Sequence, residues 1–133
     1  MKRSTVELFF PLPKSIFCLG LTTGELAVYS YLMYLENRKT YKCWPSFSTI
    51  GNAINKSKNS VKKYVDGLVD KGLITVEPTK VVTENGQVHN GTLMYTILPI
   101  REVMQRFNER QLERAQIENE RRRIASARRQ SGP

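Results

Sequence analysis

The stretch WPSFSTIGNAINKSKNSVKKYVDGLVDKGLI, residues 44–74, predicts two short helices, a tight turn between them and the start of a β-strand. The first helix is expected to begin after Ser46, because a serine side chain can accept a hydrogen bond from an amide of the first turn. Asn55 is expected at the sharp helix exit, because asparagine tolerates a left-handed backbone. Ser57 can cap the second helix in the same way, so residues 55–57 form the predicted turn.

The second helix carries one apolar stripe, which predicts that its back lies in the core. The stripe, at helical spacing, consists of Val61, Tyr64, Val65, Leu68 and Val69. Asn59, Lys63 and Asp66 point away from the stripe, with Ser60 and Lys62 on its flanks. Such a face near a helix N-terminus suits the major groove of DNA, because lysine and asparagine can donate to base edges and the helix N-terminus attracts phosphate.

These residues resemble the winged helix-turn-helix signature of bacterial DNA-binding proteins. More narrowly, the chain is similar to helix-turn-helix regulators and replication initiators of Gram-positive bacteria and their mobile elements. The resemblance covers about residues 9–98 and rests on positions that include Leu19-Gly20-Leu21, Gly24-Glu25, Trp44-Pro45-Ser46, Ile50-Gly51 and Lys71-Gly72-Leu73-Ile74. Two positions depart from the pattern. Gly51 stands where alanine is usual, which weakens a helix by roughly 1 kcal/mol, and Asn55 stands where glycine is usual.

Charge points to an anionic partner. The 133 residues carry a formal net charge of +9, which favours nucleic acid or a membrane surface. From Arg38 to Lys63 the chain has seven basic residues and no acidic one. A merely solvated surface is the alternative, but the basic segment overlaps the predicted recognition helix.

Several classes of protein are disfavoured by what the sequence lacks. Two cysteines and one histidine predict neither a disulfide scaffold nor a metal site, and no cofactor is expected. The Ser60–Lys63 spacing matches serine acylases, but no companion motif, glycine-rich phosphate loop or catalytic pair accompanies it, so we expect no enzyme and no small-molecule substrate. No secretion signal and no run of about 20 apolar residues is present. We therefore expect a cytoplasmic protein without a membrane partner.

Residues 1–20 are expected to form an extended, apolar arm that packs on the core. Their prolines disfavour helix, and large apolar residues such as Phe9, Phe10, Ile16 and Phe17 are unlikely to be left in water. A dimer contact through this arm is the alternative. The folded winged-helix domain, residues 21–99, is expected to begin with a helix capped by Thr22 and Glu25.

A β-hairpin is predicted around Asn85-Gly86, the strongest signal for a two-residue type I′ turn. Folding the chain about this turn pairs Ile74 with Ile97, Val76 with Tyr95 and Val82 with His89. The distal part extends past a small core and is expected to project as a wing along the DNA backbone or in the minor groove. A mobile hairpin that contacts nothing is the alternative.

Residues 100–133 are expected to form a C-terminal helix and a basic tail. Arginine, glutamate and glutamine dominate beyond Phe107, and no acidic residue follows Glu120. Contact with DNA phosphate, a homodimer through this helix and a disordered tail all remain open.

The predicted fold class is therefore α+β, a winged helix-turn-helix with a three-helix core, a hairpin wing and a long C-terminal helix. The predicted function is sequence-specific binding of double-stranded DNA as a transcriptional regulator. The alternatives are a replication initiator or maintenance protein of a plasmid, phage or conjugative element, and a winged-helix adaptor that binds other proteins. The predicted DNA-binding residues are Ser46, Thr49, Ser57, Lys58, Asn59, Ser60, Lys62, Lys63, Lys80, Asn85, Gln87, His89 and Asn90.

Overall fold

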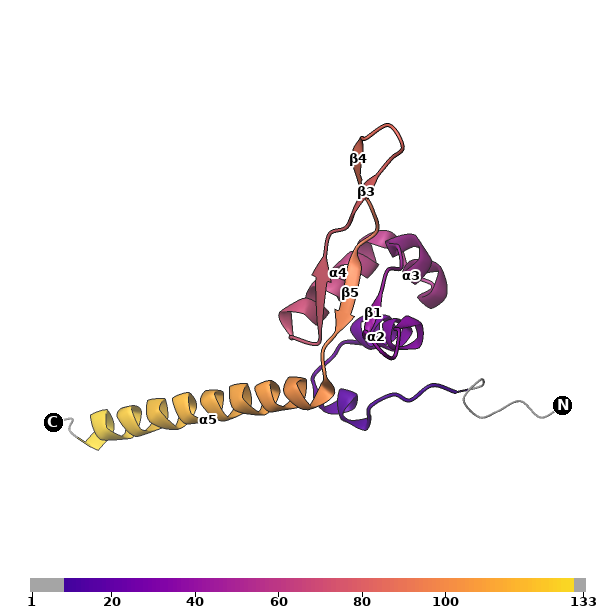
Figure 1. The fold of residues 1–133 in the computed structure, drawn as a ribbon. Helices are drawn as coiled ribbons and strands as arrows, with labels where there is room; N and C mark the ends of the chain where they lie inside the picture. The colour runs from indigo at the N-terminus through magenta and orange to yellow at the C-terminus, as the bar shows by residue number, and fades with distance from the viewer. Residues whose placement is uncertain (1–8, 131–133) are drawn as a thin grey trace. The chain divides into compact units, whose positions relative to one another are not determined.

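The computed structural model describes residues 9–130. The chain divides into two compact units, the first ending at Ile100 and the second beginning at Arg101. The first unit contains the helix-turn-helix and a projecting hairpin (Figure 1). In chain order the described elements are η1 (Lys14–Cys18), α2 (Thr23–Leu35), β1 (Lys42–Cys43), α3 (Phe47–Ile54), α4 (Lys58–Asp70), β2 (Ile74–Glu77), β3 (Lys80–Val82), β4 (Val88–Asn90), β5 (Met94–Ile97) and α5 (Ile100–Gln130).

The helix boundaries follow the predicted caps. The Ser46 side chain accepts a hydrogen bond from the Thr49 amide at the start of α3. Ser57 serves α4 in the same way, and Thr22 and Glu25 form a reciprocal capping box at α2. Asn55 ends α3 with φ of 61° and ψ of 48°, so the predicted left-handed exit is confirmed.

Three helices and a small sheet enclose the core. Its fully buried side chains include Val28, Leu32, Ile50, Val61, Leu68 and Tyr95. The predicted apolar stripe of α4 is buried at Val61, Val65 and Leu68, whereas Val69 at its edge is exposed. The back of α4 therefore lies in the core, as its periodicity indicates.

A buried carboxylate ties α2 to α4. Glu25 is only 4% exposed, and its Oε1 lies 2.6 Å from Nζ of Lys71, directly after α4. Lys71 also donates to the backbone oxygen of Gly20. Burial alone would raise the pKa of Glu25, but the hydrogen bonds from Lys71 and Thr22 outweigh it and hold that pKa below its usual value.

Close approach of these helices requires residues without side chains. A Cβ at Gly67 would lie 2.2 Å from Oε2 of Glu25, and one at Gly24 would lie 2.1 Å from the ring of Tyr64. Both distances are too short for carbon contacts, so each glycine admits the side chain of the facing helix.

The three-stranded antiparallel sheet has the order β1-β5-β2. Ile74 pairs with Ile97, and Val76 with Tyr95. The predicted register of the inner hairpin is therefore confirmed. Apolar partners on one face stabilise this register against a one-residue slip.

The outer hairpin has a different register from the one predicted. Val82 pairs with Val88, and Val81 pairs with His89, so the predicted pairing of Val82 with His89 is wrong. Between the two sheets, residues 78–79 lie opposite residues 91–93. The extra residue in the second arm is a bulge, and it shifts the pairing of everything beyond it by one position.

The tip of the hairpin agrees with this shift. Gly86 donates to the Thr83 oxygen at 2.9 Å, and the Thr83 amide donates to the Gln87 oxygen at 2.9 Å. Gly86 has φ of 78°, but Asn85 has no positive φ. A type I′ turn would need positive φ at both residues, so the connection is a three-residue loop with glycine in the left-handed position.

The N-terminal arm contacts the core through fewer residues than predicted. Ile16 and Leu19 are buried, whereas Phe9 is 67% exposed and Phe17 is 73% exposed. Residues three apart lie on one face of a 3₁₀ helix, so η1 directs Ile16 and Leu19 inward and leaves Phe17 outside. The expectation that Phe9, Phe10 and Phe17 fill the core is wrong.

The second unit consists of helix α5 from Arg101 onward. The helix continues to Gln130, past the point where the basic tail was expected to begin. Its side chains from Asn108 to Arg129 are all exposed. An ion pair between Arg122 and Glu118 at 2.8 Å supports it locally. Within residues 9–130, no helix combines the length and the apolar composition that crossing a membrane requires.

Candidate nucleic-acid interface

Helix α4 presents a basic and amide-bearing face that we call the recognition face: Lys58, Asn59, Lys62 and Lys63. All four side chains are exposed, while the neighbouring Val61 is completely buried. The helix can therefore offer these groups to a partner without losing its contact with the core. Ser60, also predicted to bind DNA, is half-buried and hydrogen-bonded to Ser57.

The start of α4 is suited to an anion. The Ser57 hydroxyl accepts a hydrogen bond from the Ser60 amide. The amides of Lys58 and Asn59 precede the first intrahelical hydrogen bond, so the helix itself provides no acceptor for them. The positive end of the helix dipole and the Lys58 side chain act at the same place. Ser57, Lys58 and Asn59 are consecutive and lie at the N-terminus of α4.

A second polar region lies where α3 begins. Ser46 caps the helix, and its Oγ lies 2.9 Å from Oγ1 of Thr49. Beside it is a hollow of about 290 Å³, lined by Pro45, Ser46, Phe47, Ser48, Lys58, Gly91, Thr92, Leu93 and Tyr95. The hollow therefore joins the first turn of α3, the first residue of α4 and the base of the wing.

Tyr95 also lines this hollow, and the sequence did not identify it as functional. The residue is completely buried, and among the described residues its hydroxyl has no hydrogen-bond partner. Burial first, and then the Cys43 thiol, raise the pKa of Tyr95 to about 12, so the hydroxyl stays protonated at neutral pH. In the sequence, Tyr95 is indistinguishable from an ordinary core residue of a strand.

The predicted polar residues of the wing are all exposed but do not share one face. Lys80 pairs directly with Asn90, while His89 pairs with Val81 and so points to the opposite face. Asn85 lies in the three-residue loop, and Gln87 follows it. In the predicted register Lys80 would share a face with His89; the changed register instead places Lys80 with Asn90 and His89 on the opposite face.

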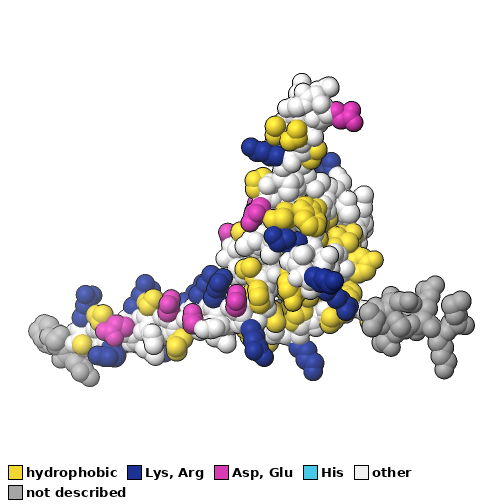
Figure 2. Space-filling model, in the orientation of Figure 1, with side chains coloured by type: hydrophobic (Ala, Val, Ile, Leu, Met, Phe, Trp, Pro, Cys, Tyr) yellow, Lys and Arg dark blue, Asp and Glu magenta, His cyan; other side chains and the backbone are white. Residues whose placement is uncertain are grey.

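The wing is also more apolar than its polar residues indicate. Val81, Val82 and Val88 are 54%, 67% and 59% exposed. Figure 2 shows hydrophobic and basic side chains together on the projecting hairpin. The sequence analysis named only polar residues of the wing as DNA contacts, so these valines were not identified.

Metal chemistry receives no support in the described part of the chain. No group of three histidine, cysteine or acidic side chains lies close enough to hold an ion in residues 9–130. The arrangement of α3, α4 and the wing is instead one of exposed donors and cations, which suits a phosphate-bearing partner.

Comparison with known proteins supports the helix-turn-helix fold. Residues 19–74 match the model of a family described as "Helix-turn-helix domain". No curated protein matches the chain significantly. Among solved structures, a possible transcriptional regulator from Methanosarcina mazei Go1 is similar, with a TM-score of 0.52 and 19% identity over 80% of this chain and 83% of the other.

A second solved structure is a MarR-family transcriptional regulator from Silicibacter pomeroyi. It has a TM-score of 0.41 and 19% identity, and the match covers 71% of this chain but only 54% of that protein. The family match and the observed elements together confirm the predicted fold: the chain carries a winged helix-turn-helix domain, followed by a long C-terminal helix.

Proposed function

We propose that this winged helix-turn-helix protein binds double-stranded DNA in a sequence-specific way and acts as a transcriptional regulator. One observation carries the proposal. Helix α4 exposes Lys58, Asn59, Lys62 and Lys63 on one face, while Val61 and Leu68 hold its back in the core. A helix with this division can enter the major groove without unfolding the domain.

In the proposed complex, the recognition face supplies two kinds of contact. Asn59 lies in the first turn of α4, where an amide can bond adenine through two hydrogen bonds. Lys62, one turn further along, is expected to pair with phosphate. Lys63 is expected to contact a base edge, because it points outward beside Asn59.

The hollow at the start of α3 is proposed to receive a backbone phosphate. Lys58 supplies a positive charge there, and the first turn of α3 supplies backbone donors. Ser46 and Thr49 lie at the same helix end. Phosphate contacts of this kind fix the register of a protein on the duplex without reading its sequence.

The wing is proposed to follow the backbone or enter the minor groove next to α4. Lys80 and Asn90 lie on one face of the hairpin, so they are expected to contact the same strand. The exposed valines favour a narrow apolar surface, such as the sugar edges that line a minor groove.

The decisive experiment selects duplexes from a random pool with the full chain and then measures affinity by fluorescence anisotropy. Specific binding predicts an enriched sequence that is bound at least about 10³-fold more tightly than a scrambled duplex. The logarithm of the binding constant should fall linearly with the logarithm of salt concentration. Absence of both enrichment and low-salt binding would contradict DNA binding and favour the adaptor hypothesis.

Genome-wide crosslinking then tests the regulatory role. Occupied promoters are expected for a regulator. Occupancy confined to a replication origin would replace regulation with the initiator role, while leaving the proposed chemistry of α4 intact.

A further inference from the structure

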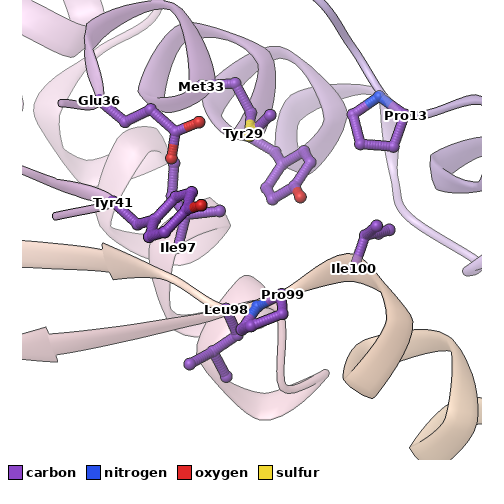
Figure 3. Close-up of a pocket in the computed structure, with 9 residues that line it drawn as sticks. All are labelled: Pro13, Tyr29, Met33, Glu36, Tyr41, Ile97, Leu98, Pro99 and Ile100. Carbon is purple, nitrogen blue, oxygen red and sulfur yellow. The ribbon is translucent and has the colours of Figure 1, made fainter. Parts of the chain in front are cut away.

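A cavity of about 250 Å³ lies in the first unit (Figure 3). Its lining includes no residue of the recognition face. Its walls come from the arm, α2, the segment before β1 and the end of β5. Most of the lining is apolar and includes Pro13, Met33, Ile97, Leu98 and Ile100. Ligand sites typically combine such a lining with a few polar groups that converge on the occupant.

Among the residues that the structure describes, Glu36 is the one acidic residue that lines this cavity. Its Oε2 is buried, and among the described residues it has no hydrogen-bond partner. Figure 3 shows the carboxyl group of Glu36 turned toward the same space as the phenol groups of Tyr29 and Tyr41. Burial of a carboxylate oxygen without a partner is unfavourable, so its retention here calls for an explanation.

The position of Glu36 in the fold adds to this electrostatic cost. Glu36 is the C-cap of α2, and its amide donates to the Leu32 oxygen. A negative charge at a helix C-terminus opposes the helix dipole. Burial raises the pKa of Glu36, and the charge of Arg38 only partly offsets that effect. Stability alone would favour an apolar or basic residue at this position.

We propose that the cavity binds a small organic cation whose apolar body fills the cavity and whose ammonium group pairs with Glu36. The buried ring of Tyr29 and the 54% exposed residue Tyr41 flank the same space (Figure 3), and aromatic faces attract cations. The volume lies just below the range of roughly 300–1,000 Å³ that is typical of ligand pockets. The occupant is therefore smaller than a drug-sized molecule. A small arylalkylamine is an example of such an occupant. This site is separate from the proposed DNA contacts and does not depend on them.

The test uses three probes of equal size and different charge: benzylammonium, benzyl alcohol and benzoate. Each is titrated into the ¹⁵N-labelled full chain, and amide shifts are followed by NMR. Benzylammonium is expected to shift the resonances of Tyr29, Met33 and Ile97 and to bind at least about tenfold more tightly than benzyl alcohol. Benzoate is expected not to bind.

Glu36→Gln keeps the shape of the side chain and removes its charge. It should reduce the preference for benzylammonium over benzyl alcohol to about one, whereas the exposed control Glu77→Gln should preserve the preference. A preference that survives in Glu36→Gln, or shifts that avoid the cavity, would overturn the proposal. Equal binding of all three probes to the unaltered chain would mean that the charge of Glu36 does not select the occupant, and binding of none would mean that the cavity takes no molecule of this kind. Either result would overturn the proposal, and this comparison decides the matter even if Glu36→Gln fails to fold.

Discussion

At the scale of single residues, Asn59 and Lys62 are both exposed on α4 but should affect binding differently. A bidentate contact between an amide and adenine distinguishes the right base from the wrong one by about 1–3 kcal/mol. Asn59→Ala should therefore weaken binding to the selected duplex by that amount and leave scrambled DNA nearly unaffected. Fluorescence titration on both duplexes measures the ratio.

Lys62→Ala should instead weaken binding to both duplexes alike. It should also reduce the slope of log affinity against log salt concentration by about one, because one phosphate contact is lost. Lys14→Ala, an exposed lysine of η1, is the control. If Asn59→Ala, Lys63→Ala and Lys62→Ala all bind like the unaltered protein, the recognition face does not contact DNA.

Gly51 illustrates a residue whose role depends on its neighbour. An added Cβ would lie 2.5 Å from the backbone oxygen of Lys56, in the turn between α3 and α4. Alanine would improve helix propensity by about 1 kcal/mol, but overpacking typically costs about 1–3 kcal/mol. Gly51→Ala should lower the melting temperature, whereas Asn52→Ala, exposed on the same helix, should raise it slightly. Equal stabilisation by both would show that the turn yields to the methyl group.

At the scale of elements, the ion pair between Glu25 and Lys71 connects α2 to the end of α4. Because the pKa of Glu25 is lowered by folding, its contribution is present above the unfolded value near 4.5 and is lost as pH falls through the folded value. Glutamine also satisfies a capping box, so Glu25→Gln removes the charge selectively. We expect a loss of about 2 kcal/mol at pH 7 that shrinks in acid.

Denaturant unfolding between pH 7 and pH 3 measures this effect. Glu77→Gln, exposed on β2, is the matched control and should leave the pH profile unchanged. A profile for Glu25→Gln that parallels the unaltered protein would mean that the pair between α2 and α4 contributes little.

The arm should stabilise the domain through a single turn of 3₁₀ helix. Ile16 is 1% exposed and Phe17 is 73% exposed. Ile16→Ala should cost about 2–5 kcal/mol, as truncation of a buried aliphatic side chain does, and Phe17→Ala should cost little. Thermal unfolding compares the two variants. A larger loss for Phe17→Ala, especially one that depends on protein concentration, would mean that the arm forms a dimer interface.

At the scale of the whole molecule, most of α5 is expected to contribute charge and little stability. The side chains from Asn108 to Arg129 are exposed, and residues 109–133 contain seven arginines and four glutamates, a net charge of +3. Truncation after Asn108 should leave the thermal transition nearly unchanged and weaken binding to all duplexes alike, because nonspecific phosphate attraction is reduced.

Affinity measured at moderate salt, together with analytical ultracentrifugation, tests this truncation. Unchanged affinity would leave the second unit without a role in DNA binding. A change from dimer to monomer would assign the exposed Leu112, Ile117 and Ile124 to a homodimer contact.

Local chemistry was sufficient to predict much of this protein. Ser46 and Ser57 cap helices because their oxygens reach an amide three residues away, and Asn55 turns because its own backbone tolerates the left-handed region. The pairing of Ile74 with Ile97 followed from apolar alternation. Each of these features depends on a few neighbouring residues or on a period that is visible in the sequence.

Tertiary structure alone decided the features that depend on distances between remote residues. Gly51 is needed because the backbone of Lys56 returns to it. The wing register depends on a bulge that the turn motif does not encode. Glu36 and Tyr95 are ordinary residues in the sequence, and only packing buries a polar atom of each without a partner. Burial of a single polar atom is set by every segment that surrounds it, so an apolar periodicity that predicts a buried helix face does not report it.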